Sequence, residues 1–193
     1  MKRKLVFGLV VVVAVGLVCS STAIAQEKKV RPSLHASVSQ TIGVDTVITF
    51  DFSRPGVKER TIWGDLVPYG LAPGNKYSEE KPFPWRAGAN EKTTIEVSND
   101  VLVDGKPLAA GKYSIHMIPS EKDWIVIFNT NNEGWGSYDY DESLDALRLT
   151  VTPVEAPFEE WMRFGFDDLA GTSAVASLLW EKLKVPFTIS VAE

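Results

Sequence analysis

Apolar and polar residues alternate with a period of two along most of the chain beyond residue 33. Ile48, Phe50 and Phe52 fall on one face of an extended segment. Thr49 and Asp51, the residues between them, fall on the other face. This alternation is typical of an antiparallel strand with one buried face.

The same pattern recurs in the stretches 147–151 and 162–166, and the run 124–128 is apolar on both faces, which indicates a central strand. Asp104-Gly105 is a favourable hairpin dipeptide between two short apolar runs. We count about nine or ten short strands and no convincing helix. The sequence therefore predicts an all-β protein, an antiparallel β-sandwich, with a jelly roll as one form of it.

The segment 174–191 predicts one long strand, or two strands broken at Pro186. In a continuous strand Glu181 would share the face of apolar neighbours such as Leu179. Burying that carboxylate without a partner would be costly. We therefore expect a β-bulge near Trp180 and Glu181 that moves the carboxylate out of the core.

The first residues have the pattern of a secretory signal peptide. A basic stretch, 2–4, precedes an uncharged apolar run, 5–18, and Ala23-x-Ala25 fits a cleavage site before Gln26. The apolar run is shorter than the ~20 residues that a membrane-spanning helix needs. We expect cleavage after Ala25 and a periplasmic or secreted mature protein.

Two alternatives to this interpretation are an uncleaved membrane anchor and lipidation at Cys19. The short apolar run argues against the first, and Val18 argues against the second because lipoprotein signals carry a small residue there. Cleavage would leave a mature chain without cysteine, and hence without a disulfide, a cysteine nucleophile or a cysteine metal ligand.

The length of 193 residues, with 45% hydrophobic and 23% charged residues, suits one globular domain. The expected organisation is a signal peptide at 1–25, a flexible lead-in at 26–33 and a single β-sandwich domain at 34–193. The signal peptide contains three basic residues and no acidic one, so its removal changes the net charge from −5 to −8. This net charge argues against non-specific binding to nucleic acid or to an anionic membrane, because both need a basic surface, and we expect neither partner.

The strand pattern is interrupted between Ser53 and Thr94 by about forty residues, a length that is uncommon for a loop in a compact domain. This segment, the long loop, contains five aromatic residues and three arginines: Trp63, Tyr69, Tyr77, Phe83, Trp85, Arg54, Arg60 and Arg86. Disordered segments are poor in aromatic residues. We expect the long loop to pack on the sandwich, with Trp85 and Arg86 as its anchors.

Guanidinium groups bind carboxylate or phosphate, and Trp and Tyr faces stack on sugars and flat ligands. The candidate ligand-binding residues are Arg54, Arg60, Tyr69, Trp85, Arg86 and Asn90. A structural alternative is that the arginines bond to loop carbonyl groups and stack on Trp63 and Trp85 without a ligand. We favour that alternative for the loop as a whole, because ordering so long a segment requires many internal contacts.

Six short blocks occur in a fixed order: Ser53-Arg-Pro-Gly56, Ile62-Trp-Gly64, Val67-Pro-Tyr-Gly70, Trp85-Arg-Ala-Gly-Ala-Asn90, Ala110-Gly-Lys-Tyr113 and Trp135-Gly136. Together they resemble the bacterial DUF2911 family of unknown function, over about 34–191. The resemblance implies an exported domain and supplies no activity and no catalytic residue. The sequence departs from the family pattern by an insertion at 72–84.

The histidines and one acidic stretch do not match the pattern of a metal site. His35 and His116, the only histidines, have no further ligand at metal spacing, and His116 is expected to be half exposed. The acidic stretch 139–145 fails the calcium-loop pattern. We predict no metal and no cofactor, and the oligomeric state is left open.

No nucleophile or phosphate-loop motif is present. We therefore expect a non-catalytic binding or envelope-associated module for a small polar, anionic or carbohydrate ligand. The alternative is a hydrolase of envelope glycans or glycoconjugates that uses a pair of carboxylates. An open cavity with two carboxylates about 5–10 Å apart would favour the hydrolase, and a shallow aromatic, arginine-lined groove without them would favour binding.

Overall fold

The computed structural model describes residues 29–192, and its compact unit begins at Arg31. The predicted signal peptide, its cleavage site and Cys19 lie outside the described residues. No helix in the described part of the chain is long and apolar enough to cross a membrane.

Ten strands and one short 3₁₀ helix make up the described chain. Their bounds are β1 (Leu34–Ile42), β2 (Thr46–Arg54), β3 (Thr94–Val97), β4 (Val101–Val103), β5 (Lys106–Leu108), β6 (Gly111–Ile118), β7 (Trp124–Asn129), η1 (Glu142–Leu144), β8 (Asp145–Val151), β9 (Val154–Ala170) and β10 (Ser173–Val191). The predicted central strand and the alternating strands are confirmed, and within residues 29–192 the only helix is the short η1.

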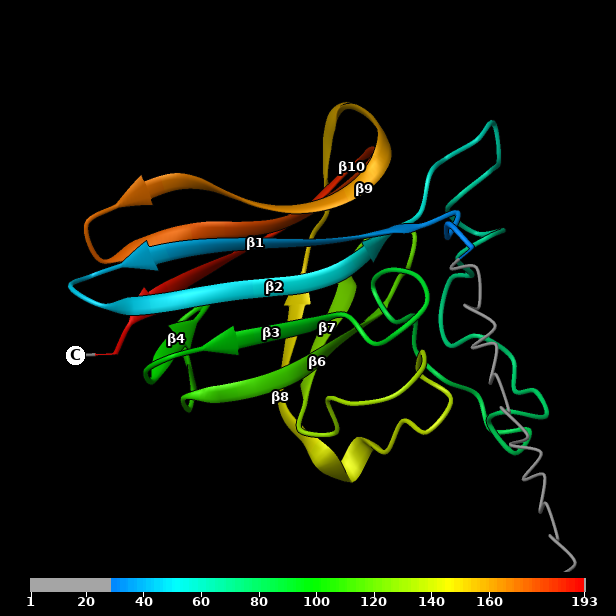
Figure 1. Cartoon of the computed structure of the whole chain (residues 1–193), viewed down its shortest axis with the longest axis horizontal. Coiled ribbons are helices and arrows are strands. Elements are labelled where there is room, and N and C mark those ends of the chain that lie inside the picture. The colour runs from blue at the N-terminus through cyan, green and yellow to red at the C-terminus, as the bar shows by residue number, and fades with distance from the viewer. Residues whose placement is uncertain (1–28, 193) are drawn as a thin grey trace, which may run out of the picture. The chain divides into compact units, whose positions relative to one another are not determined.

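The strands form two antiparallel sheets, one of six strands in the order β1-β2-β3-β6-β7-β8 and one of four in the order β5-β4-β10-β9 (Figure 1). The chain leaves the first sheet after β3 to form the β4–β5 hairpin and returns for β6, β7 and β8. It then completes the second sheet with β9 and β10. The predicted all-β sandwich is confirmed, with ten strands where a jelly roll has eight.

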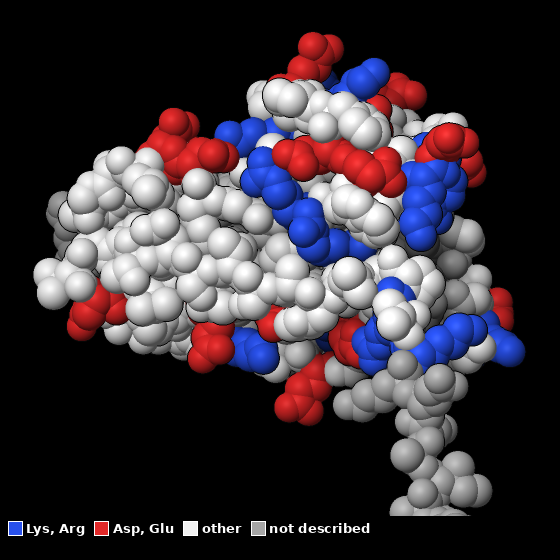
Figure 2. Space-filling view, turned by 45° about the horizontal axis from the view of Figure 1, so that its top comes forward, with Lys and Arg blue, Asp and Glu red and all other residues white. Residues whose placement is uncertain are grey.

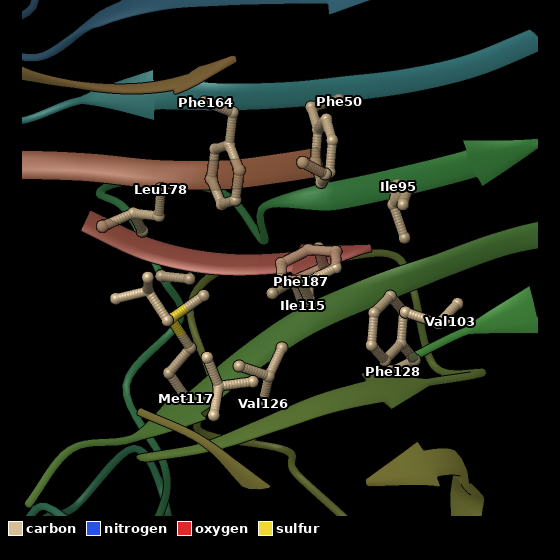
Figure 3. Packing of buried hydrophobic residues seen from close by; sticks show 14 of the residues in the cluster. Phe50, Ile95, Val103, Ile115, Met117, Val126, Phe128, Phe164, Leu178 and Phe187 are labelled. Atoms are coloured by element: carbon tan, nitrogen blue, oxygen red, sulfur yellow. The ribbon is translucent and has the colours of Figure 1, made fainter. Parts of the chain in front are cut away.

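The core lies between the sheets and is built from the inward faces of the alternating strands. Phe50 of β2 stacks on Phe164 of β9, with ring centroids 4.6 Å apart. Phe187 of β10 meets Phe128 of β7 edge-on at 5.8 Å (Figure 3). These aromatic contacts join segments distant in sequence and fix the two sheets against each other.

The last strand is one continuous element, and the β-bulge expected near Trp180 is present. The register with β9 shifts between Leu179 and Glu181, and Glu181 has a left-handed φ of 57°. Before the bulge, Leu178 and Trp180 point inward, and after it the odd positions, such as Phe187, do so. The bulge thus changes the inward-facing positions from even to odd residue numbers, and it keeps the carboxylate of Glu181 out of the core.

The long loop connects β2 to β3 and lies at the end of the sandwich where β2 finishes (Figure 1). It is ordered by backbone hydrogen bonds rather than by regular strands. Trp85 exchanges two of them with Met117 of β6, at 2.9 and 2.8 Å, and the amide of Gly70 donates to the carbonyl of Pro119. The expectation that the long loop packs on the sandwich is therefore confirmed.

The prediction of a half-exposed His116 is wrong, because its side chain is 1% exposed. Ser137 and Tyr140, from the segment that follows β7, contact the ring of His116, which strand alternation alone would leave in solvent. Nε2 of His116 hydrogen-bonds with Ser114 at 2.9 Å, and Nδ1 hydrogen-bonds with Ser137 at 2.7 Å. Burial, with the nearby charge of Lys92, lowers the pKa of His116 to about 3.

Candidate functional site

A cavity of about 380 Å³ opens at the base of the long loop. Its polar lining comes from Ser33, Arg60, Arg86 and Asn90, and its aromatic lining comes from three tryptophans: Trp85, Trp135 and Trp180. We call it the arginine cavity. Four of the six candidate ligand-binding residues, Arg60, Trp85, Arg86 and Asn90, are thus brought together.

The other two candidates lie elsewhere. Arg54 borders a separate small cavity beside Trp161, and its Nε donates to the carbonyl of Met162 at 2.8 Å. Tyr69 is 44% exposed and packs over Gly64, where an added Cβ would stand 3.0 Å from the tyrosine ring. In the structure Arg54 thus joins the long loop to β9, and Tyr69 supports a turn within it.

Arg60 is held by the loop and faces the arginine cavity. Its Nε donates to the carbonyl of Val57 at 3.1 Å, and its Nη2 donates to the carbonyl of Gly56. A guanidinium has five N–H donors, so these two bonds fix its plane and leave donors for a ligand.

Arg86 is held in the same way. Its Nη1 donates to the carbonyl of Asn90, and its Nη2 donates to Tyr138 Oη at 3.3 Å. The guanidinium lies over the Tyr138 ring, 5.3 Å from the centroid, and against the backbone of Gly136. The expected stacking on Trp63 or Trp85 is replaced by this tyrosine contact.

The turn 85–90 places Arg86 and Asn90 at the cavity. Ala87 and Asn90 have left-handed φ values of 49° and 62°, and an added Cβ at Gly88 would stand 2.6 Å from Thr93 Oγ1. The side-chain amide of Asn90 donates to the carbonyl of Ser33 at 3.1 Å. This bond ties the end of the predicted lead-in to the rim of the cavity.

Four tryptophans form a cluster beneath the long loop. Trp63 meets Trp124, Trp85 and Trp180 edge-on, with centroids 4.8 to 5.8 Å apart. Trp85 and Trp180 are stacked at 5.9 Å with an interplanar angle of 19°. The predicted role of Trp85 as an anchor agrees with these contacts and with its backbone bonds to β6.

The wall that carries Trp135 is fixed by an ion pair between a buried lysine and a partly exposed aspartate. Lys92, whose side chain is 1% exposed, lies 2.9 Å from Asp139 and also donates to the carbonyl of Asn131. Partial burial alone would raise the pKa of Asp139. Hydrogen bonds from Lys92 and Asn131 outweigh that effect and hold the pKa below its usual value.

The charged side chains that line the arginine cavity are all of one sign. The described lining contains two arginines and no carboxylate. On the face shown in Figure 2, basic and acidic side chains lie beside one another. Neighbouring charges of opposite sign compensate each other. No carboxylate lines the arginine cavity to compensate the charges of Arg60 and Arg86 in this way.

A second cavity of about 630 Å³ lies between the insertion 72–84 and the stretch 138–142. Four carboxylates line it, and each has a partner: Glu79 with Lys81, Asp139 with Lys92, Asp141 with Ser143, and Glu142 with Arg148. The insertion itself is ordered by an antiparallel bridge between Ala72 and Phe83. No group of three metal-ligating side chains occurs within residues 29–192.

Among the aromatic residues of the arginine cavity, sequence reasoning missed two as ligand contacts, Trp135 and Trp180. In the sequence, Trp135 stands out only as part of the block Trp135-Gly136. Trp180 stands out only as the neighbour of Glu181, whose carboxylate a regular strand would place in the core. Trp180 reaches the cavity from β10, far along the chain from the long loop. The signal available in the sequence was the β-bulge expected at Trp180 and Glu181, which marks an irregular position in the strand.

A family model for proteins of unknown function, DUF2911, matches residues 33–189. No curated protein and no solved structure matches the chain. Four of the six sequence blocks that carry the resemblance contribute lining residues to the arginine cavity, among them Pro55, Val67 and Trp135. These four blocks, separated along the sequence, therefore meet at one place in the fold.

Proposed function

This chain belongs to the DUF2911 family, and on that premise we propose that it is an exported, non-catalytic module that binds a small anionic ligand in the arginine cavity. The observation that carries the proposal is a concave site with two fixed guanidinium groups, aromatic walls and no lining carboxylate among the described residues. The site belongs to a chain of net charge −5, so this concentration of positive charge is not a property of the whole surface.

The size and lining of the cavity suit a small molecule. Ligand pockets usually enclose about 300–1,000 Å³ and combine apolar walls with a few convergent polar groups. The arginine cavity, at about 380 Å³, lies at the lower end of that range. Because Arg60 and Arg86 are already hydrogen-bonded to the loop, binding would cost little side-chain entropy at these two residues.

The second cavity is lined by four carboxylates, as the hydrolase alternative requires, but their state argues against it. A glycosidase needs a protonated carboxyl group whose pKa is raised, next to a second carboxylate. In the second cavity, hydrogen bonds from Ser143 lower the pKa of Asp141, and hydrogen bonds from Lys92 and Asn131 outweigh burial and lower that of Asp139. Both residues are therefore held as carboxylates, opposite to the state of a general acid.

Isothermal titration with matched anionic and neutral probes tests the proposed function. Glucuronate and benzoate are compared with glucose and benzamide, using the mature chain that begins at Gln26. We expect the acids to bind and the neutral partners to bind at least tenfold more weakly, and we expect Arg60→Gln to abolish acid binding. The control is Arg163→Gln, on β9 and paired with Glu159 outside the cavity. Equal affinities for acids and neutral analogues would refute the proposal.

A further inference from the structure

Two exposed apolar residues, Leu66 and Trp135, line the arginine cavity together with Arg60 and Arg86. We propose that the cavity takes an acid whose charged group is attached to an apolar ring, and that this ring lies against the indole of Trp135. The inference rests on the proposed function and names the ligand class and the residue that selects it.

The exposure of these two side chains makes them reachable for a ligand. Trp135 is 51% exposed and Leu66 is 43% exposed. Trp135 is also the most exposed of the six tryptophans, whereas Trp180, another lining residue, is 1% exposed. Removing apolar surface from water is favourable, and an indole offers a large face for such a contact. A ligand with an apolar body would cover surface that the chain itself leaves in water.

Trp135 and Arg86 are neighbours at the cavity. Gly136, the next residue, has a left-handed φ of 69°, and an added Cβ there would stand 2.7 Å from Arg86 Cζ. An isolated antiparallel bridge pairs Trp135 with Glu91. The residue before Glu91 is Asn90, whose carbonyl accepts a hydrogen bond from Arg86 Nη1. Both contacts bring the residue with the exposed indole close to a fixed guanidinium.

Leu66 has the same relation to the other arginine. The amide of Leu66 donates to the carbonyl of Thr61 at 3.3 Å, and the amide of Val67 donates to the carbonyl of Ile62 at 2.9 Å. The chain thus folds back on the residues that directly follow Arg60. Each arginine of the cavity therefore has an exposed apolar residue nearby, so that one ligand can meet a charge and apolar surface together.

The indole of Trp135 is held in place before any ligand binds. The guanidinium of Arg31 lies over its ring, 5.7 Å from the centroid, and pairs with Glu91. The hydrogen bond from Arg31 lowers the pKa of the Glu91 carboxyl below its usual value, so this pair stays charged at neutral pH. Trp135 is half exposed with Arg31 in position. A fixed indole costs less entropy on binding than a mobile one.

The lining favours an apolar ring over a sugar ring. A sugar acid carries several hydroxyl groups besides its carboxylate, and each of them needs an acceptor once it leaves water. Among the described lining residues, only Ser33 and Asn90 have a side-chain oxygen. A flat apolar ring needs no acceptor and gains from contact with Trp135 and Leu66.

Isothermal titration with three acids tests the ligand class. Benzoate carries its carboxylate on an apolar ring, glucuronate on a sugar ring and acetate on a methyl group. We expect the wild-type mature chain that begins at Gln26 to bind benzoate at least tenfold more tightly than either of the other acids. Glucuronate or acetate binding as tightly as benzoate would overturn the inference.

Variants of Trp135 test the residue that selects the ring. We expect Trp135→Ala to lose at least fivefold in benzoate affinity with little change for acetate, and Trp135→Phe to recover most of that loss. A disturbed site would weaken both acids, so the ratio of benzoate to acetate affinity reports on the ring contact itself. The matched control is Trp161→Ala, because Trp161 is 40% exposed and lies on β9 outside the arginine cavity.

The proposed function and this inference fail in different ways. If acids bind and Arg60→Gln abolishes binding while Trp135→Ala leaves the benzoate-to-acetate ratio unchanged, this inference fails and the proposed function stands. If no acid binds the wild-type protein, both fail. The wild-type comparison of the three acids decides the matter if Trp135→Ala does not fold.

Discussion

The arginines of the long loop combine two roles that the sequence presents as alternatives. Arg60 and Arg86 each donate to carbonyl groups of the loop, as the structural alternative requires. Both also line a cavity. Stacking on Trp63 and Trp85 does not occur, because these rings are already packed against other tryptophans. The internal bonds hold the guanidinium groups in place and so prepare the site rather than replace it.

His116 is buried in its neutral form, and this predicts that the protein loses stability in mild acid. The unfolded histidine takes up a proton near pH 6.5, whereas the folded one does so only near pH 3. Between these values the unfolded state binds more protons, so stability falls as the pH falls through this window. By pH 5 the loss is about 2 kcal/mol relative to pH 7.

Urea unfolding at pH 7 and pH 5 measures this effect. His116→Asn is expected to reduce the difference in unfolding free energy between the two pH values by about that amount. An identical pH dependence in wild type and His116→Asn would contradict the assignment of the effect to His116.

Trp85 is expected to anchor the long loop energetically. Trp85→Ala removes contacts with Trp63 and Trp180 and should cost about 3 kcal/mol, the lower end for a tryptophan because the ring is only partly buried. Thermal melts measure this loss of stability. The control is Tyr77→Ala, at an exposed residue of the same loop. A Trp85→Ala protein that melts with the wild type would show that the loop is held elsewhere.

At the scale of elements, the strands were predictable and the shape of the long loop was not. Two-residue periodicity locates strands such as β2, and the poor placement of Glu181 in a regular strand reveals the bulge. The long loop is instead fixed by contacts between distant segments, such as Asn90 with Ser33 and Arg54 with Met162. No local pattern encodes such pairs, so the sequence named four cavity residues without showing that they meet.

Gly88 tests the packing of the 85–90 turn. A Cβ at this position would stand 2.6 Å from Thr93 Oγ1, the hydroxyl that donates to the carbonyl of Ala87. Gly88→Ala should therefore cost about 1–3 kcal/mol through overpacking and weaken ligand binding. The control is Gly171→Ala, where a Cβ meets nothing within 4 Å. Equal melting temperatures for the two variants would contradict the tight packing of the turn.

At the scale of the whole molecule, the signal peptide remains a prediction from sequence. Mass spectrometry of the protein purified from its natural source should give a chain that begins at Gln26, three basic residues short of the full sequence. Detection of intact Met1 on the mature protein would show that the segment is retained.

The central claim is that the arginine cavity attracts a small anion through its charge. Leu66 lines the cavity and is 43% exposed, so its replacement need not disturb the core. The measurement is isothermal titration of the preferred acid, glucuronate or benzoate, against wild type, Leu66→Lys and Leu66→Glu at equal ionic strength. The account predicts that Leu66→Glu binds at least several-fold more weakly than wild type and Leu66→Lys at least as tightly. Equal affinity in all three proteins would contradict it.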